Sequence, residues 1–122
     1  MGEVVMEPAN EYRPVILPLQ IDRSFRPWRY QVSHRTLVLR SEARDAVPQV
    51  LDVVFMNVLA MKIRHDYRQL VISEADDLDE AADFVEVPER FRHNYRTYQV
   101  SDGTHSGFVV CGALQLRHDP TS

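Results

Sequence analysis

The sequence has a single cysteine, Cys111, and no long apolar stretch among its 122 residues. One cysteine excludes a disulfide within the chain and fits a reducing compartment. No apolar run approaches the roughly 18–20 residues that a membrane-spanning helix needs. The first ten residues contain acids but no base, whereas a secretory signal begins with a positive segment. We therefore expect a cytoplasmic protein that does not enter a membrane.

Glycine is also scarce, with four residues, and the motifs that it usually serves are missing. There is no glycine-rich phosphate loop and no Gly-x-Ser-x-Gly elbow around a nucleophile. Metal-ligand spacings such as His-x-x-x-His and Cys-x-x-Cys are missing too. Asp77 and Asp79 resemble the start of a calcium loop, but Ala81 and Ala82 follow where a ligand and a glycine belong. We predict no metal and no cofactor, and we favour a binding protein over an enzyme without excluding catalysis.

Lysine is nearly absent, because 13 of the 14 basic residues are arginine and only Lys62 is lysine. The arginines are scattered along the chain and form no run of the kind that marks a nucleic-acid patch. The net charge of −4 also works against a polyanionic partner. Nucleic acid is therefore an unlikely partner.

Bases are missing altogether from residues 74–89, where eight of the 18 acids lie. Setting these eight aside leaves 10 acids against the 14 bases, so the whole negative excess belongs to one short segment. A local field of one sign can steer a partner of the opposite sign. We therefore predict a surface that binds a basic protein, although a solvated loop would carry the same charges. The predicted partner-binding residues are Glu74, Asp76, Asp77, Asp79, Glu80 and Asp83.

Alternating apolar and polar residues predict strands over most of the chain. Residues 28–33 and 36–41 alternate on either side of a turn at His34-Arg35, which indicates a hairpin. Asp102-Gly103 is a second hairpin turn, between residues 95–101 and 107–118. Gly112 lies inside the last strand and indicates a bulge or a close backbone approach. Further strands are expected at 12–21, where Pro14 and Pro18 favour an edge, and at 49–56, 58–64 and 69–73.

These strands predict one mainly β domain over residues 1–122, with 1–11 and 119–122 poorly ordered. The expected architecture is an antiparallel sandwich or a strongly curved, partly closed sheet of about seven strands. One short helix or an acidic loop is expected near 76–86, because small and apolar residues recur there at helical spacing.

Histidine is the most plausible catalytic residue type, and acids lie near three of the five in sequence. All five fall in expected turns or at strand ends, where solvated histidines normally lie. We interpret them as surface residues and keep a site as the alternative. The five are His34, His65, His93, His105 and His118.

A few other side chains have two possible interpretations. Asp52 stands among apolar residues and either faces solvent or pairs with an arginine such as Arg40, because an unpaired buried charge is expensive. Cys111 is expected to act as a small buried hydrophobe rather than as a catalytic thiol. The aromatics are expected in the core, or in a protein interface if they are exposed. They are Trp28, Tyr30, Tyr95 and Tyr98.

Residues 32–75 carry a resemblance to known proteins. The segments are Val-Ser-His-Arg-Thr-Leu-Val-Leu-Arg-Ser from Val32, Leu-Asp-Val-Val-Phe-Met-Asn-Val from Leu51, and Gln-Leu-Val-Ile-Ser-Glu-Ala ending at Ala75. They resemble small uncharacterised β-rich proteins of actinobacteria and, loosely, immunity proteins of bacterial polymorphic-toxin systems. His34 matches a histidine after a short strand in those proteins, and residues 51–55 match their Leu-x-x-x-Phe strand. Arg35 departs from the acid that often follows that histidine.

The resemblance implies action by binding, so no catalytic residue carries over from it. Together with the acidic segment, it predicts a non-enzymatic cytoplasmic binding protein, immunity-like, that inhibits a basic protein such as a nuclease toxin. The alternative is a small β-barrel that binds or transforms a small molecule, with histidines at its mouth. A self-assembling subunit is the third possibility, since the sequence does not fix the oligomeric state.

Overall fold

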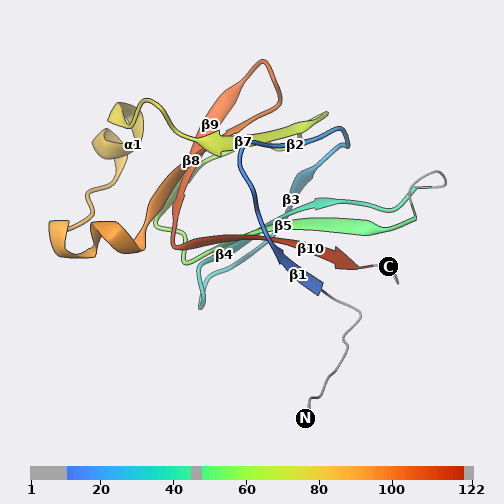
Figure 1. Ribbon diagram of the computed structural model, residues 1–122, viewed down its shortest axis with the longest axis horizontal. Helices are drawn as coiled ribbons and strands as arrows, with labels where there is room; N and C mark the ends of the chain where they lie inside the picture. The colour runs from blue at the N-terminus through green and yellow to red at the C-terminus, as the bar shows by residue number, and fades with distance from the viewer. Residues whose placement is uncertain (1–10, 45–47, 120–122) are drawn as a thin grey trace, which may run out of the picture.

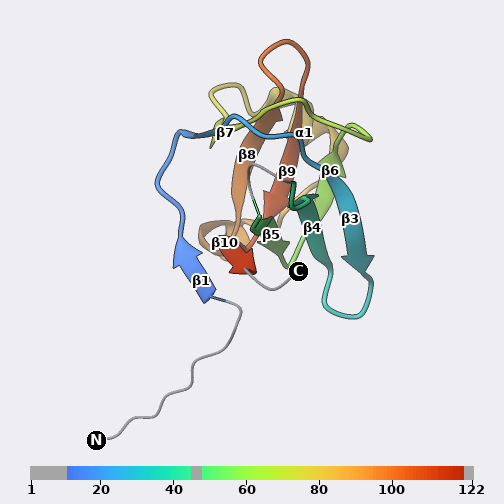
Figure 2. The same cartoon turned by 90° about the vertical axis from the view of Figure 1, so that its right-hand side faces the viewer.

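The computed structural model describes residues 11–44 and 48–119, whose strands form two antiparallel sheets (Figures 1 and 2). Sheet I has the order β1 (Glu11–Pro14), β10 (Ala113–Asp119), β5 (Val50–Met56), β4 (Thr36–Ser41) and β3 (Arg26–Gln31). Sheet II has the order β2 (Leu19–Ile21), β7 (Leu70–Glu74), β8 (Arg96–Ser101), β9 (Ser106–Cys111) and β6 (Ala60–Lys62). A helix α1 (Asp79–Phe84) and a 3-10 helix η1 (Glu89–Asn94) lie between β7 and β8.

The core lies between the two sheets and is filled by side chains at alternate strand positions. Sheet I contributes Leu39, Val53 and Phe55, and sheet II contributes Ile72 and Val100, all with no exposed surface. Burying an aliphatic or aromatic side chain of this size contributes about 1.5–3 kcal/mol each. The predicted mainly β, antiparallel architecture is confirmed, and it has the layered form of a sandwich rather than of a closed barrel.

The prediction of about seven strands was wrong, because the described residues form ten. Two segments for which the sequence predicts a single strand each form two strands. Residues 12–21 give β1 and β2, which join different sheets, and residues 107–118 give β9 and β10 on either side of Gly112. Sequence alternation continues across such a division, so the pattern alone does not reveal it.

Gly112 marks a corner where the chain passes from sheet II to sheet I. Its N–H donates to the carbonyl oxygen of Met56 at 2.9 Å, and a Cβ added to Gly112 would lie 3.3 Å from the Cβ of Asn57. At the same corner Asn57, which has a positive φ of 57°, lies in the turn that leads from β5 to β6. The predicted close backbone approach at Gly112 is therefore confirmed.

The acidic segment forms the short helix that the spacing predicted, now bounded as Asp79–Phe84. Ala81 is buried in a small cluster with Phe108 and Val110 of β9, and the Phe84 ring stands edge-on to that of Phe108 at 5.9 Å. Acids in the first turn of α1 are favourable near the positive end of the helix dipole. In Figure 1, α1 and η1 stand together to one side of β8 and β9.

The ends of the described chain lie in strands, since β1 begins at Glu11 and β10 ends at Asp119. Poor order at these two residues stays a prediction. The rest of that prediction concerns residues 1–10 and 120–122, which lie outside the described residues. No helix in the described part of the chain is long and apolar enough to cross a membrane.

Candidate functional site

An open cavity of about 720 Å³ lies between α1, residues 85–87 and the strands β8 and β9. We call it the acidic groove. Its wall is largely apolar and includes Leu78, Phe84 and Val85, while Asp83 and Glu86 add two carboxylates. Arg92 of η1 adds one guanidinium group, whose Nε atom donates a hydrogen bond to the carbonyl oxygen of Val87 at 3.2 Å. Phe84 is 67 % exposed and Leu78 is 53 % exposed, although both are large apolar side chains. The acidic segment therefore presents apolar surface and negative charge together.

The predicted partner-binding acids do not all play the same part. The Glu74 carboxylate accepts a hydrogen bond from the Nη1 atom of Arg96 at 3.1 Å. The Glu80 carboxylate accepts one from the Nζ atom of Lys62 at 2.6 Å. These two ion pairs are well exposed, and pairs of this kind contribute about 0–1 kcal/mol. The carboxylates of the remaining predicted acids make no ion pair with any other described residue. They are Asp76, Asp77, Asp79 and Asp83.

Of the six predicted acids, Asp83 alone lines the groove. Glu86, which the prediction of site residues left out, lines it as well. Asp77 instead lies just before the helix, where its carboxylate accepts a hydrogen bond from the backbone N–H of Asp79 at 2.9 Å. Leu78 is one of the apolar residues whose helical spacing predicts a buried face, but its side chain is exposed. The exposure of Leu78 and Phe84 depends on how α1 docks on β9, which the sequence pattern does not specify.

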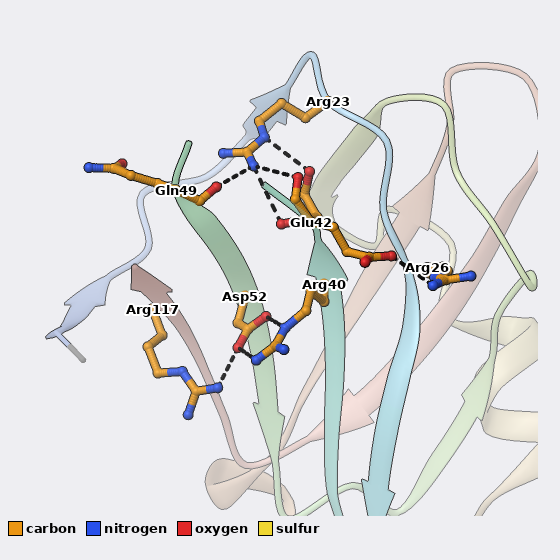
Figure 3. Close-up of polar contacts among 8 residues, drawn as sticks. Arg23, Arg26, Arg40, Glu42, Gln49, Asp52 and Arg117 are labelled. Carbon is orange, nitrogen blue, oxygen red and sulfur yellow. Dashed lines mark hydrogen bonds and ion pairs between the residues drawn. The ribbon is translucent and has the colours of Figure 1, made fainter. Parts of the chain in front are cut away.

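Asp52 is fully buried on the face of sheet I that points away from the core (Figure 3). Arg40 of β4 donates to both of its carboxylate oxygens, from Nε at 2.8 Å and from Nη2 at 2.9 Å. Arg117 of β10 donates to the Asp52 Oδ2 atom from the other side. The expectation that Asp52 faces solvent was therefore wrong, and the predicted pair with Arg40 is confirmed. Arg117 was missed, since the register that places it beside Asp52 joins segments 65 residues apart.

Trp28 lies over the same face, at the edge strand β3. The guanidinium carbons of Arg40 and Arg26 lie 4.9 Å and 5.3 Å from the centre of its ring, which places both cations within cation–π range. Trp28 is 42 % exposed and Tyr30 is 38 % exposed, so the expectation of core positions was wrong for both. A register shift between Pro27 and Arg29 moves Trp28 out of the alternation that its sequence suggested.

Arg23 joins two loops at one end of this face (Figure 3). Its Nη2 atom donates to the carbonyl oxygen of Gln49 at 2.7 Å, and its Nε atom donates to the hydroxyl of Ser41 at 3.0 Å. Beside Arg23, the Glu42 carboxylate accepts a hydrogen bond from the Nη2 atom of Arg26 at 2.7 Å. These bonds hold loop backbone in place and leave Arg23 as a structural residue.

The histidines do not converge on a catalytic centre. His65 is 90 % exposed and lies 3.8 Å from Asp66, while His105 lies 3.5 Å from Asp102 in an exposed hairpin turn. Backbone N–H groups of His105 and Thr104 lower the pKa of Asp102 to about 2, which marks a turn-stabilising carboxylate. Within residues 11–44 and 48–119, no two histidines share a carboxylate.

Cys111 is fully buried, and burial raises the pKa of its thiol to about 12. A thiol that stays protonated at neutral pH is a poor nucleophile, so the structure agrees with the role of a small core residue. The described residues contain no group of three or more His, Cys, Asp or Glu side chains that could hold a metal ion.

Comparison with known proteins gives no family for this chain. No protein-family model, curated protein or solved structure matches it.

Proposed function

We propose that the protein is a non-enzymatic binding protein that captures a basic protein partner in the acidic groove. The observation that carries this proposal is the juxtaposition of exposed apolar side chains with carboxylates that make no ion pair in the described structure. Phe84 and Leu78 supply the apolar part, and Asp83 and Glu86 supply the charge. A partner segment that fits this surface has arginine or lysine on both sides of an apolar anchor.

The two parts of the surface act on different steps of association. Carboxylates on the rim speed the encounter with a basic partner and have less effect on how long the complex lasts. Apolar side chains that become desolvated at the centre of an interface supply most of the binding energy. Phe84 is suited to that role, because its ring packs edge-on against Phe108 while most of its surface stays open.

An immunity-like role follows as the finer form of the proposal. Proteins that act on nucleic acid present basic surfaces to the phosphate backbone, and an acidic protein can cover such a surface. The acids of residues 74–89 give the protein a negative surface suited to that task. In this form of the proposal the protein inhibits a nuclease toxin by occupying its basic substrate face.

The proposal is tested with a synthetic peptide that carries arginines on both sides of a leucine pair. Titration of the ¹⁵N-labelled protein should shift the amide signals of α1, residues 85–87, β8 and β9. Phe84→Ala should raise the dissociation constant about tenfold, as for loss of an interface anchor. Ile16→Ala is the matched control, since Ile16 is also exposed but belongs to another part of the molecule.

The same peptide with glutamate in place of arginine should not bind. Amide shifts that spread over the whole surface would contradict the groove as the binding site. An equal loss of peptide affinity in Phe84→Ala and Ile16→Ala would contradict it as well. Absence of any shift at millimolar peptide would contradict the proposal itself.

A further inference from the structure

A second cavity, of about 420 Å³, lies on the outer face of sheet I. It shares no lining residue with the acidic groove, although Asn57 in its lining donates a hydrogen bond to the hydroxyl of Tyr95 in the groove at 3.1 Å. It opens over β3, β4, β5 and β10, between the end of the β3–β4 hairpin and the corner at Asn57. Its volume falls within the range of roughly 300–1,000 Å³ that is usual for small-molecule sites. We call it the sheet I cavity.

The floor of the sheet I cavity is apolar. Val38 and Val54 stand side by side on β4 and β5, and they are only 2 % and 4 % exposed although they point away from the core. Met56 continues this floor toward the corner. A thioether on a flexible side chain adapts to the shape of an apolar ligand.

The rim of the sheet I cavity is basic and polar. Arg29 and Arg117 stand on the strands at either side of it, and His34, Gln31 and Thr36 line it from the hairpin. None of the described residues that line it is an aspartate or a glutamate. Arg29 is exposed and makes no ion pair or hydrogen bond with the described residues. The described lining therefore offers positive charge and hydrogen-bond donors, with the Arg117 guanidinium group also bound to the carboxylate of Asp52 beside the cavity.

Arg117 is held in a fixed position at this rim. Its side chain is 13 % exposed, and it donates to Asp52, which lies outside the cavity lining. Asp52 is itself fixed by the two bonds from Arg40 (Figure 3). A guanidinium group that is already immobilised loses little side-chain entropy when an anion binds beside it.

We propose that the sheet I cavity binds a small organic anion, with its carboxylate or phosphate group between Arg29 and Arg117. The apolar body of this ligand lies on Val38, Val54 and Met56. Guanidinium groups bind both kinds of oxyanion in forked geometry, so the two head groups share one chemistry. This site is independent of the acidic groove and does not rest on the proposed protein partner.

The test uses benzoate and phenyl phosphate as probes, in isothermal titration and in ¹⁵N-detected titration of the folded chain. Both anions should bind, with amide shifts centred on β3, β4, β5 and β10. The tighter of the two identifies the head group as carboxylate or phosphate. Benzyl alcohol has a similar apolar body without the charge, and it should bind at least about tenfold more weakly, as expected for loss of a charge-assisted contact.

Two variants separate this site from unspecific charge attraction. Arg29→Gln should weaken anion binding about tenfold, while Arg68→Gln, at an exposed arginine elsewhere, should change it less than about twofold. Gln31→Glu places a carboxylate on the rim and should abolish binding, whereas Gln99→Glu on β8 should not. All four positions lie at exposed side chains, so the melting temperature should stay near that of the wild type.

Three results would overturn the proposal. One is that neither anion shifts the sheet I amides, and another is that benzyl alcohol binds as well as the anions. The third is that Arg29→Gln and Arg68→Gln weaken anion binding equally, which would show that the anions are attracted to the whole surface rather than to one site. If an acidic peptide binds at β3–β10 while both small anions fail, the face is a protein contact and the small-molecule proposal is wrong.

Discussion

Arg40 holds the buried carboxylate of Asp52 in a fork, with its Nε and Nη2 atoms each bound to a different carboxylate oxygen at 2.8 and 2.9 Å. Bidentate geometry of this kind is the strongest form of side-chain ion pair. The pair stands on the outer face of sheet I, yet Asp52 has no exposed surface. The fork therefore joins β4 to β5 where solvent does not compete for the charges.

Asp52→Asn should destabilise the protein by about 3 kcal/mol, because it leaves the largely buried guanidinium groups of Arg40 and Arg117 facing a neutral amide. The free energy of unfolding from urea denaturation is the appropriate measurement. Asp22→Asn is the control, since Asp22 is exposed, and it should change stability by less than about 0.5 kcal/mol. A loss below about 1 kcal/mol for Asp52→Asn would show that the fork is not a structural requirement.

Asp102 gives a prediction about acid stability. Backbone N–H groups lower its pKa from 3.8 to about 2, so folding favours the charged form. The stabilisation is present above pH 4 and is lost as the pH falls toward 2. Asp102→Asn keeps an oxygen that can accept the N–H groups of Thr104 and His105 but removes the titration. Its melting temperature should approach that of the wild type between pH 5 and pH 2, and a difference that stays constant over this range would contradict the assignment.

Two glycines at close approaches should respond differently to alanine. A Cβ on Gly107 would lie 1.9 Å from the backbone oxygen of Lys62, whereas a Cβ on Gly112 would lie 3.3 Å from the side chain of Asn57. Forcing a Cβ against backbone, as at Gly107, costs about 1–3 kcal/mol or more. The Asn57 side chain beside Gly112 can move aside at a lower cost. Gly107→Ala should therefore lower the urea midpoint clearly more than Gly112→Ala does. The reverse order would contradict the packing of β6 on β9.

Local patterns carried most of the fold prediction. The hairpin of β3 and β4 follows from alternation around His34-Arg35, and the hairpin of β8 and β9 follows from Asp102-Gly103, where Gly103 has a φ of 95°. Helical spacing placed α1 within one turn of its observed bounds. These features depend on neighbours in sequence, which is why the pattern reveals them.

The features that the sequence did not reveal depend on tertiary register. Trp28 leaves its expected face because β3 shifts register beside it, and Arg117 reaches Asp52 through the pairing of β10 with β5. Side chains on both faces of β5 are buried, so the alternation of apolar and polar residues did not show that Asp52 is buried as well. The exposure of Phe84 likewise follows from the docking of α1 on β9, which no local pattern encodes.

The rate of association with a basic partner tests the acidic groove most directly. We would measure it by stopped flow with the arginine–leucine peptide, at several salt concentrations, for the wild type and for Asp83→Asn with Glu86→Gln, the two acids that line the groove. The control is Asp22→Asn with Asp66→Asn, which changes the net charge equally at exposed sites elsewhere. The groove variant should associate about threefold more slowly at low salt and equally fast at high salt, because screening removes steering. Equal association rates for the groove variant and the control at every salt concentration would contradict the proposed function.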